Sequence, residues 1–254
     1  MHQNPWASLG HGQTRRAMQE GGRPSFPPQT LPWWWGWNVG PLLASSPLGL
    51  HLSEFMRVNK LKSVPTLKDA DFVLTESSAI LIYLSCKYQI ADHWYPRDLQ
   101  ARARIHEYLG WHADHIHGTF GVPLWTRVLA PLIGIQVPEE KVERNRTAMD
   151  RALKRLEDKF LGDRAFLSGQ QVTLADLMAL EELIQPVAVG HDLFEGRQRL
   201  AAWRGRVEAF LGAELCQEAH GPIFSILEQV AKKTFPVPPP EAYPTILSHI
   251  ARIP

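Results

Sequence analysis

Residues 168–176, which read Ser-Gly-Gln-Gln-Val-Thr-Leu-Ala-Asp, constrain the fold more than any other part of the chain. Thr173 can act as the N-cap of a helix, with its hydroxyl accepting a hydrogen bond from the amide of Asp176. The carboxylate of Asp176 can reach back to the amide of Thr173, which closes a capping box, and Val172 and Leu177 occupy the positions of a hydrophobic staple. The segment therefore predicts a helix that begins directly after Thr173, and both residues of the box have a structural role.

Apolar residues follow a helical period throughout the chain beyond Tyr95 and Pro96. The spacing predicts a long helix over residues 98–120 and a second over residues 139–161, each with one apolar face. Two further helices follow Thr173, and others are expected near residues 223–232 and 243–252, separated by the Pro-rich run at 236–240. The apolar positions that carry these predictions are Ile105, Leu109, His112 and Ile116; Val142, Met149, Leu153, Leu156 and Phe160; and Leu200, Trp203, Val207 and Phe210.

A short α/β unit precedes the helical part. Residues 64–67 and 72–74 are two apolar runs around the polar turn 68–71, which predicts two strands. Thr75-Glu76-Ser77-Ser78 then leads into the apolar run 79–84, and a Ser or Thr before such a run indicates the start of a helix. The local order is strand, strand, helix.

Residues 1–50 differ from the rest of the chain. Gly and Pro pairs and four tryptophans within residues 33–37 show no lasting period, so we expect an irregular segment, with a sticky surface patch or a ligand platform as the alternative. The expected units are therefore an atypical segment at 1–50, an α/β remnant at 51–92, a helical domain at 93–235, and a Pro-rich turn with an extension helix at 236–254.

Composition excludes several classes of function. The net charge of +1 gives no reason to expect nucleic acid or a membrane surface as a partner. Cys86 and Cys216 form no CxxC pattern, so free thiols in a reducing compartment are expected. The run 122–137 is too interrupted to span a bilayer, and Arg15 and Arg16 are not followed by the apolar core of a signal peptide. We therefore expect a soluble, cytoplasmic protein.

Four histidines at positions 106, 112, 115 and 117 raise the question of a metal site. His106 and His117 share a helix face but lie ~16 Å apart along the axis at 1.5 Å per residue. His112 and His115 are one turn apart without the glutamate of an HExxH pattern. No metal is expected.

Several segments together resemble the glutathione transferases of the theta class, and within that class the second subgroup. The likeness is carried by the strand-strand-helix unit with Val64-Pro65 before it, by the capping box, and by residues 75–81, 93–96, 109–114 and 201–203. It covers residues 51–254. The resemblance implies an α/β plus all-α fold, in which a partial thioredoxin-like βα unit is followed by the all-helical glutathione-transferase C-terminal domain.

The resemblance also implies a function: conjugation of reduced glutathione to small hydrophobic electrophiles, by a homodimer with glutathione as co-substrate and no cofactor. Hydroperoxidase and sulfate-ester side activities occur among such relatives. The alternative is a non-catalytic, truncated isoform that dimerises or binds hydrophobic ligands, because the thiol-activating serine of the family has no recognisable counterpart in residues 1–50. No catalytic residue is assigned.

Individual site residues follow from the same resemblance. The Pro65 bond matches the family's cis-proline, which turns the Val64 backbone toward the cysteinyl part of glutathione; an ordinary trans-proline at a strand start is the alternative. Glu76 and Ser77 match the pair that holds the γ-glutamyl end, although the same residues also suit a plain helix cap. Trp125 is expected in the electrophile pocket or, alternatively, in the core. The expected glutathione-binding set is Leu50, His51, Ser63, Val64, Glu76, Ser77, Asp114, His115, Ile116 and His117.

Three positions depart from the family pattern. Ser63 stands where a lysine is usual, His117 where close relatives have a pocket arginine, and Leu50-His51 where a His-Lys pair contacts the glycine carboxylate. Each change removes a fixed positive charge from a site for an anionic tripeptide, and one charge-assisted hydrogen bond contributes roughly 1.5–3 kcal/mol.

Overall fold

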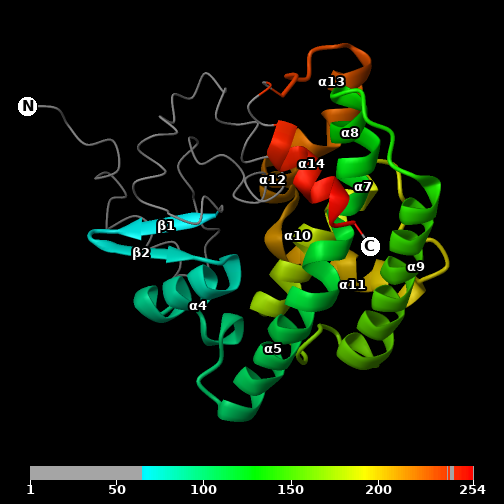
Figure 1. Ribbon diagram of the computed structural model, residues 1–254. Helices are drawn as coiled ribbons and strands as arrows, with labels where there is room; N and C mark the ends of the chain where they lie inside the picture. Colours follow the sequence, from blue (N-terminus) through cyan, green and yellow to red (C-terminus); the bar gives the residue numbers. More distant parts are fainter. Residues whose placement is uncertain (1–64, 239, 241–242, 254) are drawn as a thin grey trace, which may run out of the picture.

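The structure is a computed structural model that describes residues 65–238, 240 and 243–253. Figure 1 shows a β-hairpin with one helix packed below it and a larger helical part beside them. The tryptophan cluster at 33–37 and the expected ligands Leu50, His51, Ser63 and Val64 lie outside the described residues.

The hairpin consists of β1 (Thr66–Asp69) and β2 (Phe72–Thr75). The strands are antiparallel, with Thr66 opposite Thr75 and Asp69 opposite Phe72. Ala70 has a left-handed backbone, φ 53°, because the two residues between the strands must reverse the chain within a tight turn. The predicted pair of strands is confirmed, with the first strand beginning at Thr66.

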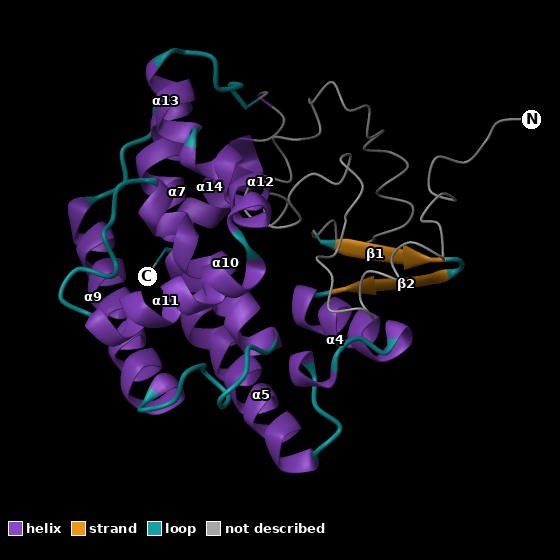
Figure 2. Cartoon of the chain, turned by 180° about the vertical axis from the view of Figure 1, so that it is seen from behind, coloured by secondary structure: helices purple, strands orange, loops and turns teal. Residues whose placement is uncertain are grey.

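Helix α4 (Ser77–Tyr88) covers one face of the hairpin (Figure 2). Asp69 of β1 accepts hydrogen bonds from Tyr83 and Lys87 of this helix. The Tyr83 ring also packs against Phe72, with the ring centroids 5.2 Å apart. The predicted helix start is confirmed at Ser77; the N-cap is Glu76, and among the described residues no side chain caps the helix.

The helical part begins with a long helical segment, residues 99–132, in which α-helical and π-helical turns alternate. The π-helical turns (η2 and η3) each accommodate an extra residue in the helix, which changes the direction in which the following side chains point. The elements, in order, are the 3-10 turn η1 (Asp92–Trp94), α5 (Leu99–His112), η2 (Ala113–His117), α6 (Gly118–Phe120), α7 (Val122–Leu124), η3 (Trp125–Leu129) and α8 (Ala130–Leu132). Helix α5 begins where the sequence predicts it, because Asp98 caps it by accepting from the amide of Ala101 at 2.8 Å.

The second long helix also ends in a π-helical turn and agrees with the predicted span. The remaining elements are α9 (Glu139–Arg155), η4 (Leu156–Leu161), α10 (Leu174–Ala188), α11 (Gln198–Leu211), α12 (Ala213–Phe224), α13 (Ile226–Ala231) and α14 (Tyr243–Ala251). The helix predicted near 223–232 is α13, which begins three residues later than expected, whereas α12 before it was not predicted. Phe210, expected on the buried face of α11, is 53% exposed and packs edge-on against Trp94.

Helix α10 lies at the centre of the molecule, in contact with α5, α11, α12 and α4 (Figures 1 and 2). The predicted capping box at its start is present. The amide of Thr173 donates to Asp176 Oδ2 at 2.9 Å, and Thr173 Oγ1 accepts from the amide of Ala175 at 3.2 Å. The other oxygen of Asp176 accepts from the amide of Leu167 and from Trp203 Nε1, both at 2.8 Å.

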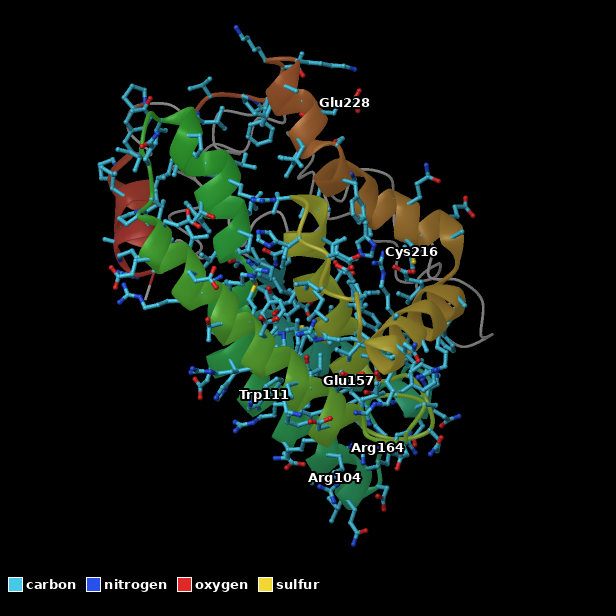
Figure 3. The ribbon with its side chains drawn as sticks, turned by 90° about the vertical axis from the view of Figure 1, so that its right-hand side faces the viewer. Arg104, Trp111, Glu157, Arg164, Cys216 and Glu228 are labelled. Carbon is cyan, nitrogen blue, oxygen red and sulfur yellow. The ribbon has the colours of Figure 1, made fainter. Side chains whose placement is uncertain are left out.

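The C-terminal helix α14 closes the helical part against η3. Its buried side chains are Ile246 and Ile250, and Ile253 follows them. Lys141 of α9 holds the end of the chain, because its Nζ donates to the carbonyls of Ala251 at 3.2 Å and Ile253 at 2.6 Å. Figure 3 shows the length of the helical part, with Arg104 near one end and Glu228 at the other.

None of the helices formed by the described residues is both long and apolar enough to cross a membrane.

Candidate functional site

The N-terminus of α4 has an unusual backbone conformation. Glu76, its N-cap, is exposed and has φ 69° and ψ 116°, outside the regions that residues with a side chain usually occupy. Backbone conformations of this kind cost of order 1–3 kcal/mol and concentrate at ligand-binding sites. Among the described residues, no side chain caps this helix start, so its first amides and the positive end of the helix dipole favour a carboxylate ligand.

Ser77 connects this helix start to the central helix. Its Oγ donates to the sulfur of Met178 on α10 at 3.7 Å. One turn further along α10, Glu182 Oε1 lies 2.7 Å from Nδ1 of His117. Residues four apart lie on one face of a helix, so a single face of α10 brings the predicted ligands Ser77 and His117 together.

Glu182 is a buried carboxylate, and each of its two oxygens has a hydrogen-bonding neighbour, His117 or Gln185. Its side chain is 6% exposed, whereas that of His117 is 39% exposed. Gln185 Nε2 donates to the second oxygen, Oε2, at 2.8 Å. A carboxylate buried to this extent requires such partners, because an unpaired charge in the interior is costly.

Two further polar residues lie behind Glu182 on α5. Burial lowers the pKa of His112, and burial together with the charges of Asp176 and Glu182 raises the pKa of Tyr108. Both side chains are therefore neutral near pH 7. His112 Nε2 and Tyr108 Oη are buried without a hydrogen-bond partner among the described residues, so this polar pocket has unused donor and acceptor capacity.

The predicted segment 114–117 forms the π-helical turn η2, which divides its side chains between two environments. Asp114 and His115 are exposed, and the ring of His115 stacks on Trp111 with centroids 5.4 Å apart. Ile116 is fully buried in the core. The structure thus places Asp114, His115 and His117 at or near the surface and the Ile116 side chain inside.

Trp125, predicted in the electrophile pocket, begins η3 and is 5% exposed. Its ring stacks on His249 of α14, with centroids 4.6 Å apart and planes at 8°. Burial, together with Arg252, lowers the pKa of His249, so the stacked imidazole is neutral near pH 7. The pocket assignment of Trp125 stays a prediction.

Comparison with known proteins decides the family. Residues 49–85 match the model of the glutathione S-transferase N-terminal domain, and residues 115–209 match that of the C-terminal domain. Human glutathione S-transferase theta-2B is 78% identical over 207 residues, which cover 81% of this chain and 85% of the relative. The chain belongs to the theta-class glutathione S-transferases. A rat theta-2 transferase is 76% identical over the same shares of the two chains.

Solved structures of theta-class transferases share the fold. The human theta-2 enzyme in complex with glutathione and an unknown ligand has a TM-score of 0.78 at 79% identity, over 79% of this chain and 83% of that chain. A human theta-class transferase in complex with the glutathione conjugate of 1-menaphthyl sulfate gives the same TM-score and identity, over 79% of this chain and 82% of that chain. The predicted fold, a thioredoxin-like unit followed by a helical domain, is confirmed, and by its family this chain is a transferase enzyme that conjugates glutathione.

Sequence reasoning missed two residues that connect the predicted ligands Ser77 and His117, namely Met178 and Glu182. Both residues lie in α10, most of whose residues are buried. The spacing of residues in the sequence does not identify Ser77 and His117 as their partners. The useful signal was the glutamate at 182, since a charged residue on the inner face of a buried helix needs a partner. Pro65 is buried at the start of β1, and the bond between it and Val64 lies outside the described residues.

Proposed function

We propose that this theta-class transferase binds the γ-glutamyl end of glutathione at the N-terminus of α4 and transfers the tripeptide to small hydrophobic electrophiles. The observation that carries the proposal is the open start of α4, where Glu76 has a strained backbone and no side chain of the described residues caps the helix. Strain at an exposed residue beside the first amides of a helix is typical of a ligand-binding site.

Each end of the γ-glutamyl group has a matching partner. The Ser77 hydroxyl and the first amides of α4 suit the carboxylate, while the Glu76 carboxylate suits the ammonium group. Asp114, His115 and His117 would complete the site from η2, and Ile116 would support them through the core. The backbone of Val64, oriented by Pro65, and the side chains of Leu50, His51 and Ser63 would contact the cysteinyl and glycine parts.

The electrophile would lie beside Trp125, where the terminal helix α14 packs across η3. Trp125 is buried, so the exposed ring of His249, which stacks on it, would form the flat wall for an aryl substrate, with Trp125 behind it. The human relative bound to the conjugate of 1-menaphthyl sulfate supports an aromatic electrophile of about that size. Glutathione acts as the co-substrate, and no cofactor takes part.

We further propose that the chain works as a cytoplasmic homodimer. Its two described cysteines are unpaired, which fits a reducing compartment. The dimer is an expectation of the family, and Phe72, 48% exposed on the hairpin, is an apolar residue available for such an interface. Analytical ultracentrifugation should give twice the chain mass of 28.8 kDa; a monomer at micromolar concentration would contradict it.

Turnover of an aryl halide with glutathione, measured beside binding to immobilised glutathione, tests the function. Ser77→Ala should raise the KM for glutathione by on the order of tenfold, because it removes a hydrogen bond to a charged group. Ser78→Ala, one residue further into the same helix, is the matched control. Binding without turnover in the parent protein would favour the alternative of a non-catalytic isoform, and a folded protein with neither glutathione binding nor turnover would exclude the enzymatic function.

A further inference from the structure

We propose that Met178 is a positioning residue for Ser77, whose hydroxyl it holds in one rotamer at the start of α4, ready for the ligand that binds there. The inference rests on the proposed function in one respect, because it takes that ligand to be glutathione. Met178 belongs to the central helix α10 rather than to α4, and it acts only through the Ser77 hydroxyl.

The first step is the contact between the two side chains. The hydroxyl of Ser77 donates to the sulfur of Met178, with Oγ and Sδ 3.7 Å apart. Met178 is 7% exposed, so its sulfur is shielded from water. Helices α4 and α10 pack against each other, which keeps the two side chains together. The contact therefore favours one of the three staggered rotamers that a serine side chain can adopt.

The second step is that Met178 has a fixed place on α10. This helix begins directly after Thr173, and the carboxyl of Asp176 ties its first turn to the amide of Thr173 and to the indole of Trp203 on α11. Met178 follows two residues after Asp176 and is buried in the same part of the helix. The acceptor for Ser77 is thus attached to an element that the rest of the helical part holds in position.

The third step is the strength of the acceptor. A thioether is a weak acceptor, whereas a hydrogen bond to an ionised carboxylate is roughly twice as strong as one between neutral groups. Ser77 is the first residue of α4, so its hydroxyl lies beside the amides at which the γ-glutamyl carboxylate would bind. Rotation about the Cβ–Oγ bond can then turn the proton from the sulfur to the ligand while Oγ stays in place. Met178 orders the hydroxyl without competing strongly for its proton.

The size of the effect follows from the number of rotamers. Without the sulfur, Ser77 can populate three staggered wells, and if only one of them suits the ligand, the dissociation constant rises by up to about threefold. Met178→Leu makes this change, because it removes the acceptor and nearly conserves the volume of the side chain. Met149→Leu is the matched control, since Met149 is buried in the core on α9.

The test is calorimetric titration of the full chain with S-hexylglutathione. Met149→Leu should bind like the parent, and Met178→Leu should bind about threefold more weakly. In the Ser77→Ala background, Met178→Leu should have no further effect, because no hydroxyl remains to be positioned. An equal loss of affinity in both backgrounds would show that Met178 acts through packing alone and would overturn the proposal, as would an unchanged affinity of Met178→Leu.

A ligand-free measurement separates this proposal from the proposed function. The Hα–Hβ coupling constants of Ser77 in NMR spectra should correspond to one rotamer in the parent and to averaged rotamers in Met178→Leu. If S-hexylglutathione fails to bind but this difference is present, the glutathione site is wrong and the positioning by Met178 stands. If the ligand binds and the couplings are averaged in the parent, the positioning role is wrong and the function stands. If Met178→Leu fails to fold, Met178→Ile replaces it in both measurements.

Discussion

Asp176 accepts hydrogen bonds from three parts of the chain: the capping residue Thr173, the loop residue Leu167 and the α11 residue Trp203. Burial raises the pKa of this carboxyl, while the hydrogen bonds act in the opposite direction by favouring its charged form. We call Asp176 a structural hub because its carboxyl accepts hydrogen bonds from several parts of the chain. Each of these donors becomes an unsatisfied buried group when the acceptor is removed.

Asp176→Ala should therefore cost more than the loss of a helix cap. We expect about 3 kcal/mol or more of unfolding free energy, because the Leu167 amide and Trp203 Nε1 both lose their acceptor in the core. Thr173→Ala removes one side of the capping box and should cost about 1 kcal/mol. Urea denaturation of both variants measures the difference, and equal costs would contradict the role of Asp176 as a hub.

His112 should make the fold less stable in acid. Its folded-state pKa is lowered by burial, so below the unfolded-state value, near 6.5, the unfolded chain binds more protons than the folded chain. The stability that the neutral imidazole provides is complete above that value and is lost as the pH falls toward the lower folded-state pKa. The slope for one proton is at most about 1.4 kcal/mol per pH unit.

Thermal unfolding between pH 7.5 and pH 5 tests this expectation. His112→Gln should unfold at a lower temperature than the parent at pH 7.5 but should lose less stability on acidification. His106→Gln is the control, because His106 is exposed and hydrogen-bonds Tyr95 at the surface. If His112→Gln and the parent lose the same stability, His112 is not the titrating group.

At the scale of elements, local signals in the sequence predicted most of the helices. Asp98 and Thr173 are side-chain caps that act within three residues, so the starts of α5 and α10 could be located directly. The start of α12 could not be located in this way, since its N-cap, Gly212, has no side chain to cap it. The π-helical turns also gave no signal, because an extra residue per turn leaves the apolar composition unchanged.

The site was predictable only as a family pattern. Residues 76 and 77 form a local motif, and so do residues 114–117, but the contact between the two motifs passes through Met178 and Glu182. Those partners are separated from them by more than sixty residues, and no period or spacing encodes such a distance. The burial of Ile116 within its motif depends on the π-helical geometry of η2, which residue type alone does not reveal.

Helix α14 should detach when its anchor is removed. Lys141→Met keeps the apolar stem of the lysine but removes the ammonium group that holds the carbonyls of Ala251 and Ile253. We expect faster cleavage by proteases within the Pro-rich run at 236–240, because the helix then loses its polar anchor and is held by its buried isoleucines and the stacking of His249 on Trp125. Limited proteolysis followed by mass spectrometry measures the rate.

Lys154→Met is the matched control for that experiment. Lys154 also extends from α9, but it pairs with Asp158 on its own face of the helix at 2.8 Å. Its substitution should leave the cleavage rate unchanged. Equal acceleration in both variants would mean that α9 as a whole has been loosened, and would contradict the anchoring role of Lys141.

At the scale of the whole molecule, the contact between Ser77 and Met178 means that a ligand at α4 is coupled to the central helix. S-hexylglutathione at one hundred times its dissociation constant should add about 2.7 kcal/mol to the unfolding free energy. We expect the hairpin and the helical part to unfold in one transition that shifts as a unit to higher temperature. Two transitions, of which only the earlier one moves with ligand, would show that the parts are not coupled.

The two described cysteines differ in their surroundings and lie in different parts of the molecule. Cys86 is exposed on α4, whereas Cys216 is half-buried on α12, where burial and the nearby charges of Glu208 and Glu181 raise its pKa (Figure 3). Thiolates react and thiols do not, so at neutral pH a maleimide dye should label Cys86 first and Cys216 slowly. Sequential labelling with a donor and an acceptor fluorophore would then place one dye on α4 and the other on α12 without any substitution. Energy transfer between the two dyes would report changes in the distance from α4 to α12 when the protein binds or releases a ligand.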